Sequence, residues 1–294
     1  MNAVAASHAS PGHPSLPASL SDEALARESV VAQAAIRRHR FVIIGLRIAV
    51  LVLVLGGWEL SANLKWIDPF FYSQPSLIWA QIVDWIRDGT SQGPLWQQVA
   101  VTLEETIIGF LIGGIGGIIA GILLGRNKLL SDVFSLYIQI ANSVPRVVLG
   151  SVFVIALGLG MASKVALAVV MVFFVVFGNA FQGVREADKY LIANARILGA
   201  SPRQLTTAVV IPSAMSWILA SLHVSFGFAL VGAVVGEFLG ARQGMGLLIS
   251  TAQGAFNASG VFAAMIVLAV VALIADFLLT RLEKRLLKWR PAVF

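Results

Sequence analysis

Six apolar segments, each long enough to cross a lipid bilayer, dominate this sequence. They cover about residues 41–62, 103–125, 133–157, 164–184, 213–236 and 259–281. A membrane-spanning helix needs about 20 mostly apolar residues, and in lipid only helices and closed barrels satisfy every backbone group. Only 12% of the residues are charged, whereas soluble domains carry roughly 25%. The pattern predicts an all-α polytopic membrane protein with six transmembrane helices.

The distribution of lysine and arginine over the connecting loops predicts the orientation of these helices. One set of loops, which includes both termini and residues 185–212, carries fifteen of the 21 basic residues, and the opposite set carries four. Arg47 and Arg146 lie inside spans. Cytoplasmic loops are enriched in Lys and Arg. Both termini and the 185–212 loop are therefore predicted to be cytoplasmic, and the net charge of +6 needs no nucleic acid partner.

The apolar segments divide the chain into four regions. Residues 1–40 form a basic cytoplasmic tail, rich in Ser, Pro, Ala and His, which is expected to be disordered except for a short surface helix over 22–40. Residues 41–102 hold the first span and a periplasmic loop, with an amphipathic helix predicted over Ser76–Arg87. The transmembrane domain follows over 103–285, with a structured cytoplasmic segment at 186–212. Residues 286–294 form a C-terminal cytoplasmic tail.

No catalytic or metal-binding constellation can be assembled from the sequence. The chain has no cysteine, so thiolate catalysis and cysteine-ligated metals are excluded. It contains no phosphate-binding loop, HExxH pair or GxSxG elbow. Ser221, His223 and Ser225 follow one another at two-residue spacings, which place them on different faces of a helix. We therefore predict no catalytic residue, no bound metal and no cofactor.

Glycine recurs at every fourth position in the second span, at Gly109, Gly113, Gly117, Gly121 and Gly125. Without side chains between them, two helix backbones can approach closely. This glycine ladder is expected to pack against another helix of the bundle, and a sliding surface for conformational change is the alternative.

Polar residues inside the third and fifth spans are candidates for a translocation pathway. The third span contains Asn142, Ser143, Pro145 and Arg146, and Pro145 is expected to kink or break the helix. Arg146 either lines the pathway or snorkels to the cytoplasmic surface. Glu237 ends the fifth span, where it either lines the outer pathway or anchors a re-entrant turn, with Arg242 as a candidate partner.

The segment Ile192–Pro212 is the longest polar, helix-forming interruption between two apolar segments. Gly199 permits a left-handed backbone turn, and Pro202 suits the first turn of a following helix. The sequence therefore predicts two short helices joined at Gly199, which are too structured for a mere connector and could dock a soluble partner.

These residues resemble the permease subunits of binding-protein-dependent ABC importers, most closely the taurine/sulfonate/nitrate-type branch. The family's cytoplasmic signature reads EAA, three residues, Gly, nine residues and I-x-L-P. With its Gly on Gly199, the EAA positions fall on Ala193, Asn194 and Ala195, and the final pair on Ile211 and Pro212. The motif glutamate is absent at Ala193. The runs TLEETIIGF, PRVVLGSVFVIALGLG, GEFLGARQGMGLLI and LEKRLLKW also look family-like over about residues 100–290, although Ser151 stands where a second Pro is usual.

The resemblance implies a mechanism and a set of partners. Two permease copies form the pathway, each docks on an ABC ATPase subunit that uses the ATP, and a soluble binding protein delivers substrate from outside. The ATPase-coupling residues implied by the motif are Ala193, Asn194, Ala195, Arg196, Leu198, Gly199, Ala200, Ser201, Pro202, Arg203, Ile211 and Pro212. The branch and Arg146 indicate a small anion as substrate, such as a sulfonate, nitrate or an aromatic carboxylate.

Two other classes of function compete with this interpretation. A stand-alone channel or secondary carrier would transport without an ATPase, and carriers commonly show an inverted repeat, which we do not find here. A polytopic membrane enzyme would need a polar catalytic constellation within the spans.

Overall fold

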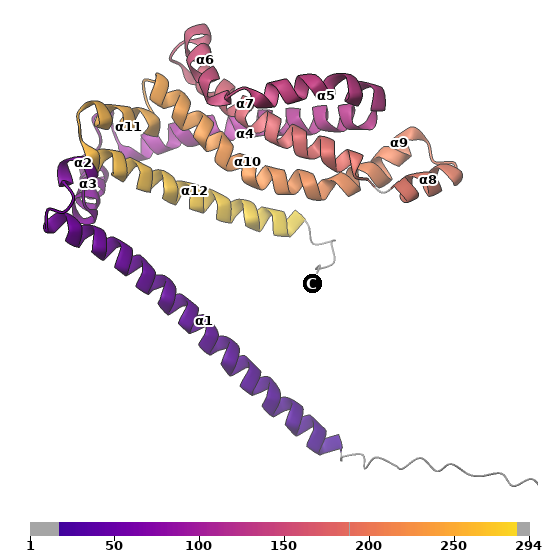
Figure 1. Ribbon diagram of the computed structural model, residues 1–294, viewed down its shortest axis with the longest axis horizontal. Coiled ribbons are helices and arrows are strands. Elements are labelled where there is room, and N and C mark those ends of the chain that lie inside the picture. Colours follow the sequence, from indigo (N-terminus) through magenta and orange to yellow (C-terminus); the bar gives the residue numbers. More distant parts are fainter. Residues whose placement is uncertain (1–17, 188, 287–294) are drawn as a thin grey trace, which may run out of the picture. The chain divides into compact units, whose positions relative to one another are not determined.

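The computed structural model describes residues 18–187 and 189–286, and every element in them is helical (Figure 1). The chain divides into two units, residues 1–63 and 64–294, which are described separately. In the first unit α1 runs from Ala18 to Asn63, and its apolar part, His39–Asn63, is long enough to cross a membrane. Helix α1 continues without a break across the predicted boundary at residue 40. Residues 1–17 of the predicted tail lie outside the described residues.

Three long helices form the core of the second unit: α4 (Leu95–Arg126), α7 (Met161–Arg185) and α10 (Ile211–Leu239). The glycine ladder of α4 packs directly against α7. A Cβ atom on Gly113 would lie 2.7 Å from the Val169 carbonyl oxygen, and one on Gly121 would lie 2.8 Å from that of Phe177. The expected packing role of the glycines is therefore confirmed.

The order of these contacts gives the relative directions of the three helices. Along α4 the glycines meet residues of α7 in ascending order, from Ala168 beside Gly109 to Val184 beside Gly125, so α4 and α7 are parallel. Helix α10 runs the other way, because Gly232 lies against Ala168 near the start of α7. Its beginning packs near the end of α7, where Ala214 shares a buried cluster with Val184.

The predicted third span over 133–157 is two helices rather than one. Helix α5 (Lys128–Ser143) ends before Pro145, and a short 3₁₀ turn η1 (Arg146–Val148) leads into α6 (Leu149–Leu157). The two halves meet at an angle of 70°. Proline lacks the N–H that would continue α5 and forces Val144 into an extended conformation, with ψ of 127°. The predicted break at Pro145 is thus confirmed, and residues 133–157 count as one span only if the two bent halves are taken together.

The other spans agree with the expected segments apart from their ends. The described residues contain five helices long and apolar enough to cross a membrane, or six if the bent pair counts as one crossing. Helix α4 begins at Leu95, eight residues before the predicted start of its span. The last span is α12 (Ala258–Leu286), and residues 287–294 of the predicted tail are outside the described residues.

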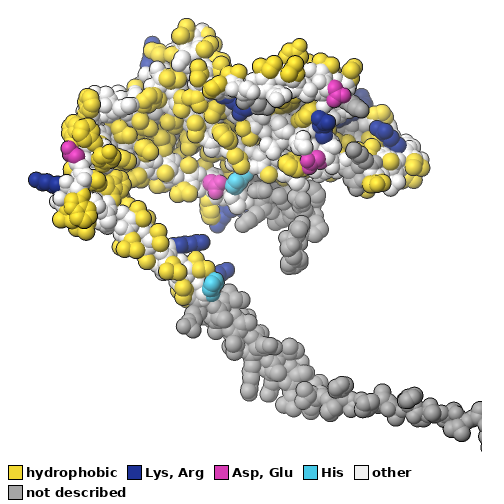
Figure 2. All heavy atoms as spheres, viewed as in Figure 1, with side chains coloured by type: hydrophobic (Ala, Val, Ile, Leu, Met, Phe, Trp, Pro, Cys, Tyr) yellow, Lys and Arg dark blue, Asp and Glu magenta, His cyan; other side chains and the backbone are white. Residues whose placement is uncertain are grey.

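Short helices cover the end of the core where α4 begins. They are α2 (Pro69–Tyr72), the predicted amphipathic helix as α3 (Pro75–Arg87), and α11 (Met245–Gly254). Ile78 and Ile82 bury one face of α3, while Trp79 and Ile86 remain exposed. At the opposite end lie α8 (Lys189–Ile197), α9 (Pro202–Leu205) and the π-helical turn η2 (Thr206–Val210). Figure 2 shows hydrophobic side chains over much of the visible face of the helical bundle, as expected for a lipid-facing surface.

Candidate functional site

The predicted helix pair is present in the 186–212 segment, and its turn lies at Gly199. Helix α8 ends with two hydrogen bonds, from the Ala200 N–H to the Ala195 carbonyl (3.0 Å) and from the Gly199 N–H to the Arg196 carbonyl (3.0 Å). These two bonds form a Schellman motif, which requires a residue with a left-handed backbone conformation directly after the helix. Gly199 supplies it with φ of +82°.

The second short helix starts at a fully formed capping box. The Ser201 hydroxyl accepts a hydrogen bond from the Gln204 N–H at 3.3 Å, and the Gln204 side chain accepts one from the Ser201 N–H at 2.8 Å. Pro202 occupies the first turn, where its missing N–H has no cost. Helix α9 then continues through η2 into α10, so that one helical rod runs from Pro202 to Leu239. The second part of the 186–212 segment is therefore continuous with a core helix.

The tip of this segment exposes large apolar side chains. Ile197 and Leu198 are 83% and 86% exposed, and Tyr190 is 82% exposed. Exposed apolar patches on a rigid element are typical of protein–protein contacts. Ala193, Asn194, Arg196, Pro202 and Arg203 are exposed as well.

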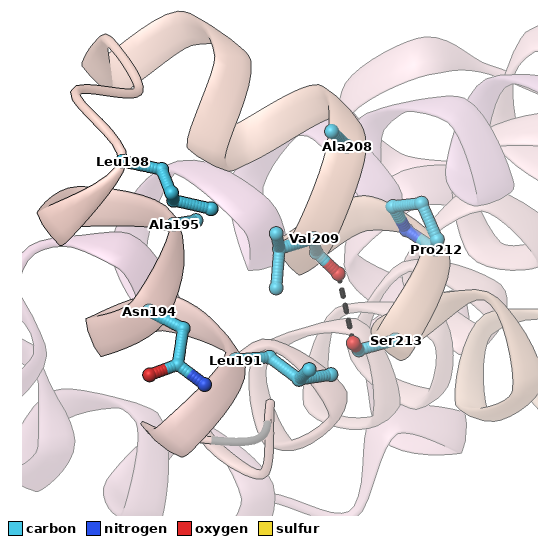
Figure 3. Close-up of a pocket in the computed structure, with 8 residues that line it drawn as sticks. All are labelled: Leu191, Asn194, Ala195, Leu198, Ala208, Val209, Pro212 and Ser213. Carbon is cyan, nitrogen blue, oxygen red and sulfur yellow. Dashed lines mark hydrogen bonds between the residues drawn. The ribbon is translucent and has the colours of Figure 1, made fainter.

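A groove of about 510 Å³ separates α8 from the start of α10 (Figure 3). Leu191, Asn194, Ala195 and Leu198 line one side, and Ala208, Val209, Pro212 and Ser213 line the other. The groove is mostly apolar, and the Ser213 hydroxyl donates to the Val209 carbonyl at 2.8 Å. The structure thus places the two ends of the predicted signature, Asn194–Ala195 and Pro212, across one groove.

The predicted pathway residues contact different partners. The Arg146 guanidinium lies over the Phe174 ring, 5.0 Å from its centroid, and Ser143 donates to the Gln139 carbonyl at 3.0 Å. The side chain of Asn142 lies outside the described residues. Glu237 contacts α4 and the turn before α11 instead, so Arg146 and Glu237 do not form one site.

Glu237 is fully buried, and its partners are not the predicted Arg242, which is exposed. One carboxylate oxygen accepts from the Thr102 hydroxyl at 2.7 Å, and the other accepts from the Gly246 N–H at 2.6 Å. The Gln98 side chain accepts from the Gly244 N–H at 2.8 Å. Side chains of α4 and α10 therefore cap the free N–H groups at the start of α11.

Sequence reasoning missed this buried polar cluster. Glu105 is 3% exposed, and Lys164, the first residue of the predicted fourth span, is fully buried. The Lys164 ammonium donates to the carbonyl oxygens of Leu159 (2.7 Å) and Gly160 (3.1 Å). The sequence shows a charged residue near the start or end of an apolar segment in each case. The same pattern is expected for a charged residue at the membrane surface, so it does not indicate burial.

His223 of α10 pairs with Asp276 of α12, with 2.9 Å between Nε2 and Oδ1. No group of three or more His, Asp or Glu side chains within residues 18–187 and 189–286 could hold a metal ion.

Curated relatives resemble the chain over most of its length. It is 29% identical to a Bacillus subtilis (strain 168) protein named as an aliphatic sulfonates transport permease, SsuC, over 81% of this chain and 85% of the relative. It is also 29% identical to the riboflavin transport system permease protein RibX of Chloroflexus aurantiacus, over 87% of this chain and 94% of the relative.

Solved structures share the fold. A chain of the MetNI methionine ABC transporter, in an inward-facing conformation, aligns with a TM-score of 0.58 at 20% identity and covers 65% of this chain and 95% of that one. The model of the family described as binding-protein-dependent transport system inner membrane component matches residues 113–288, which include the helix pair and groove. The chain belongs to this family of ABC importer permeases.

Proposed function

We propose that this permease carries a small organic anion of the sulfonate class, forms its pathway with a second permease copy, and docks on an ATPase through residues 186–212. Membership of the family makes the chain a transporter component rather than an enzyme, with ATP handled by a separate ATPase partner. It also implies a substrate-binding protein as a partner.

The observation that carries the docking proposal is the exposed apolar tip on a continuous rod. Ile197 and Leu198 lie at the turn between α8 and α9, and α9 is continuous with α10 through Leu239. A partner that moved the tip would therefore move a core helix with it, as in rigid-body switching. Loss of the motif glutamate at Ala193 removes one charge and leaves this mechanical connection intact.

Six crossings with both termini in the cytoplasm are supported by the direction of the core helices. Because α4 and α7 are parallel, the chain from Asn127 to Gly160 must return from the end of α4 to the start of α7. The bent pair α5–α6 provides that return, and it acts as one crossing. The basic loop at 185–212 then lies on the cytoplasmic side, where an ATPase can reach it.

The anion class is supported by the relative SsuC and by Arg146 on the α7 side of the bend. RibX is equally identical to this chain and is named for riboflavin. Because relatives named for different substrates resemble this chain to the same degree, a separate binding protein is expected to select the ligand.

The docking proposal is tested by purifying the chain from its native membrane in mild detergent, identifying an ATPase that co-purifies, and measuring ATP hydrolysis. The variant Leu198→Asp places a charge in the apolar contact and is expected to lower ATPase recovery by at least tenfold. Phe71→Asp is the matched control, because Phe71 is 63% exposed at the other end of the bundle. Equal recovery with Leu198→Asp would show that the tip is not the docking surface. Transport by the chain without any ATPase would instead favour a channel or carrier.

A further inference from the structure

A second cavity, of about 490 Å³, lies behind the helix pair at the end of the bundle where α4 and α7 finish. Its walls come from α4, α5, α7, α8, α9 and η2. Helix α8 separates this cavity from the groove, because Ile192 and Arg196 face the cavity while Leu191, Ala195 and Leu198 face the groove. These spacings of four residues match the two sides of one helix.

Three arginines from three different helices line the cavity. Arg126 ends α4, Arg185 ends α7 and Arg196 lies in the last turn of α8. None of the described residues that line the cavity is acidic. The Arg185 guanidinium lies over the Phe181 ring, 5.5 Å from its centroid, which holds the charge near the cavity. The lining therefore concentrates positive charge.

A buried hydroxyl points to the same kind of ligand independently of the charges. Ser131 of α5 lines the cavity and is 3% exposed, and its Oγ has no hydrogen-bond partner among the described residues. A buried hydroxyl without a partner costs about 1–3 kcal/mol. A hydroxyl can donate to an anionic oxygen that the arginines would also attract.

The usual distribution of basic residues in membrane proteins explains only part of this arrangement. Arginine is favourable in the last turn of a helix, and cytoplasmic loops collect basic residues in any case. Neither effect predicts that the three side chains converge on one cavity, or that a buried serine lacks an acceptor there. An anion in the cavity would account for both observations.

We propose that this cavity binds the phosphate group of an anionic membrane phospholipid. Phosphate oxygens accept from arginine and hydroxyl donors together, and the apolar walls formed by Val184, Ile192, Leu205 and Val210 suit the glycerol and upper acyl carbons. The ends of α4 and α7 mark the cytoplasmic surface of the membrane, where headgroups are present. The proposal rests on the proposed orientation of the chain, and it is independent of ATPase docking.

The bound lipid would stabilise α8 on the side of the helix that faces the cavity. Arg196 would reach the phosphate from one side of the helix while the apolar tip stays free for the partner. The lipid would therefore stabilise the position of the helix pair relative to the ends of α4 and α7.

The test is native mass spectrometry of the purified full-length chain with phosphatidylglycerol or phosphatidylcholine of identical acyl chains. The wild-type chain is expected to bind phosphatidylglycerol with the higher affinity. Arg126→Gln and Arg196→Gln should each weaken this binding about fivefold, the effect of about 1 kcal/mol per basic residue. Ser131→Ala should weaken it severalfold without a change in charge, and it should not reduce stability, because it removes an unsatisfied hydroxyl.

Arg281→Gln is the matched control, because it removes one positive charge from α12 outside the cavity. Its phosphatidylglycerol affinity should equal that of the wild-type chain. Equal binding of both lipids, or an equal loss in Arg281→Gln and Arg126→Gln, would overturn the proposal. Inorganic phosphate should compete with the lipid only at high concentration. If phosphate binds at Arg126 and Arg196 while the lipid does not, the ligand is a soluble anion and the lipid proposal is wrong.

Discussion

At the scale of single residues, the turn before α11 depends on two glycines that lie against the Glu237 carboxylate. Gly244 has φ of +112°, and a Cβ atom there would overlap the carboxyl group of Glu237. A Cβ atom on Gly246 would lie 2.7 Å from the Glu237 Cβ. The short sequence from Glu237 to Gly246 therefore holds the buried Glu237 carboxyl group against the Gly246 N–H, and there is no space for a side chain at either glycine.

We predict that Gly244→Ala lowers the free energy of unfolding by about 2 kcal/mol or more, because it adds backbone strain to a steric overlap. Thermal unfolding of the purified chain in detergent measures the effect. Gly227→Ala is the control, since a Cβ atom at Gly227 meets nothing within 4 Å and the residue is helical. A Gly244→Ala chain as stable as Gly227→Ala would show that the turn rearranges freely.

The conformation of a residue could be predicted from the sequence where it depends on the neighbouring residues in the chain. The turn at Gly199 and the helix start at Pro202 follow from backbone preferences of neighbouring residues, and both are present. The partner of Glu237 could not be predicted, because Thr102 is 135 residues away in the chain. Arg242 was chosen for its proximity in sequence, which says little about a fold that joins distant helices.

At the scale of elements, the parallel helices α4 and α7 lie close enough for their backbones to be in contact. Glycines at every fourth position allow α4 to meet the carbonyl oxygens of Val169, Phe173 and Phe177. Side chains add to this backbone contact, since Phe110 and Ile118 of α4 pack against Val172 and Val176. Close approach of this kind increases van der Waals contact, which is a main attraction between helices in lipid. The two helices should therefore move as one body.

A methyl group on the contacting face should separate them. We expect Gly121→Ala to destabilise the chain by about 1–3 kcal/mol, because its Cβ would lie 2.6 Å from the Ala180 Cβ. Gly116→Ala is the matched control on the same helix, with 3.5 Å to the Phe173 ring. Apparent unfolding temperatures in one detergent compare the two. A larger loss in Gly116→Ala than in Gly121→Ala would contradict the packing described here.

The sequence pattern predicted which helices exist better than it predicted the residues at which they begin and end. The apolar segments and the amphipathic helix over 76–87 were predicted, as was the break at Pro145. The sharp angle between α5 and α6 could not be predicted, because hydropathy measures length and composition but not direction. The start of α4 at Leu95 was missed since Gln97 and Gln98 are polar, although Gln98 is fully buried.

At the scale of the whole molecule, the direction of the helices predicts which loops share a side of the membrane. The chain has no cysteine, so single-cysteine variants need no altered background. Ser15→Cys, Ser201→Cys and Ala292→Cys should react with an impermeant maleimide from the cytoplasmic side, and Ser91→Cys from the opposite side. Labelling of intact cells and of inverted vesicles measures this. Ser15 and Ala292 on opposite sides would mean five crossings, which would also remove the basis for the lipid proposal.

Only two features of the sequence predicted the arrangement of the whole molecule: the unequal distribution of Lys and Arg between the loops, and the lengths of the apolar segments. They indicated six crossings and a cytoplasmic helix pair, while the parallel direction of α4 and α7 emerged from contacts between Gly109–Gly125 and Ala168–Val184. The cavity with Ser131 brings together residues from α4 to η2, and no local pattern in the sequence marks it.

The buried polar cluster also has a consequence for how the chain is made. Thr102 and Glu105 leave the ribosome long before Glu237, which lies 135 residues after Thr102. At about 5–20 residues per second, the delay is roughly 7–27 seconds. Helix α4 is complete once Arg126 has been added, when Glu237 of α10 is still to be synthesised. The early membrane-inserted chain therefore contains the polar residues of α4 without their partner from α10.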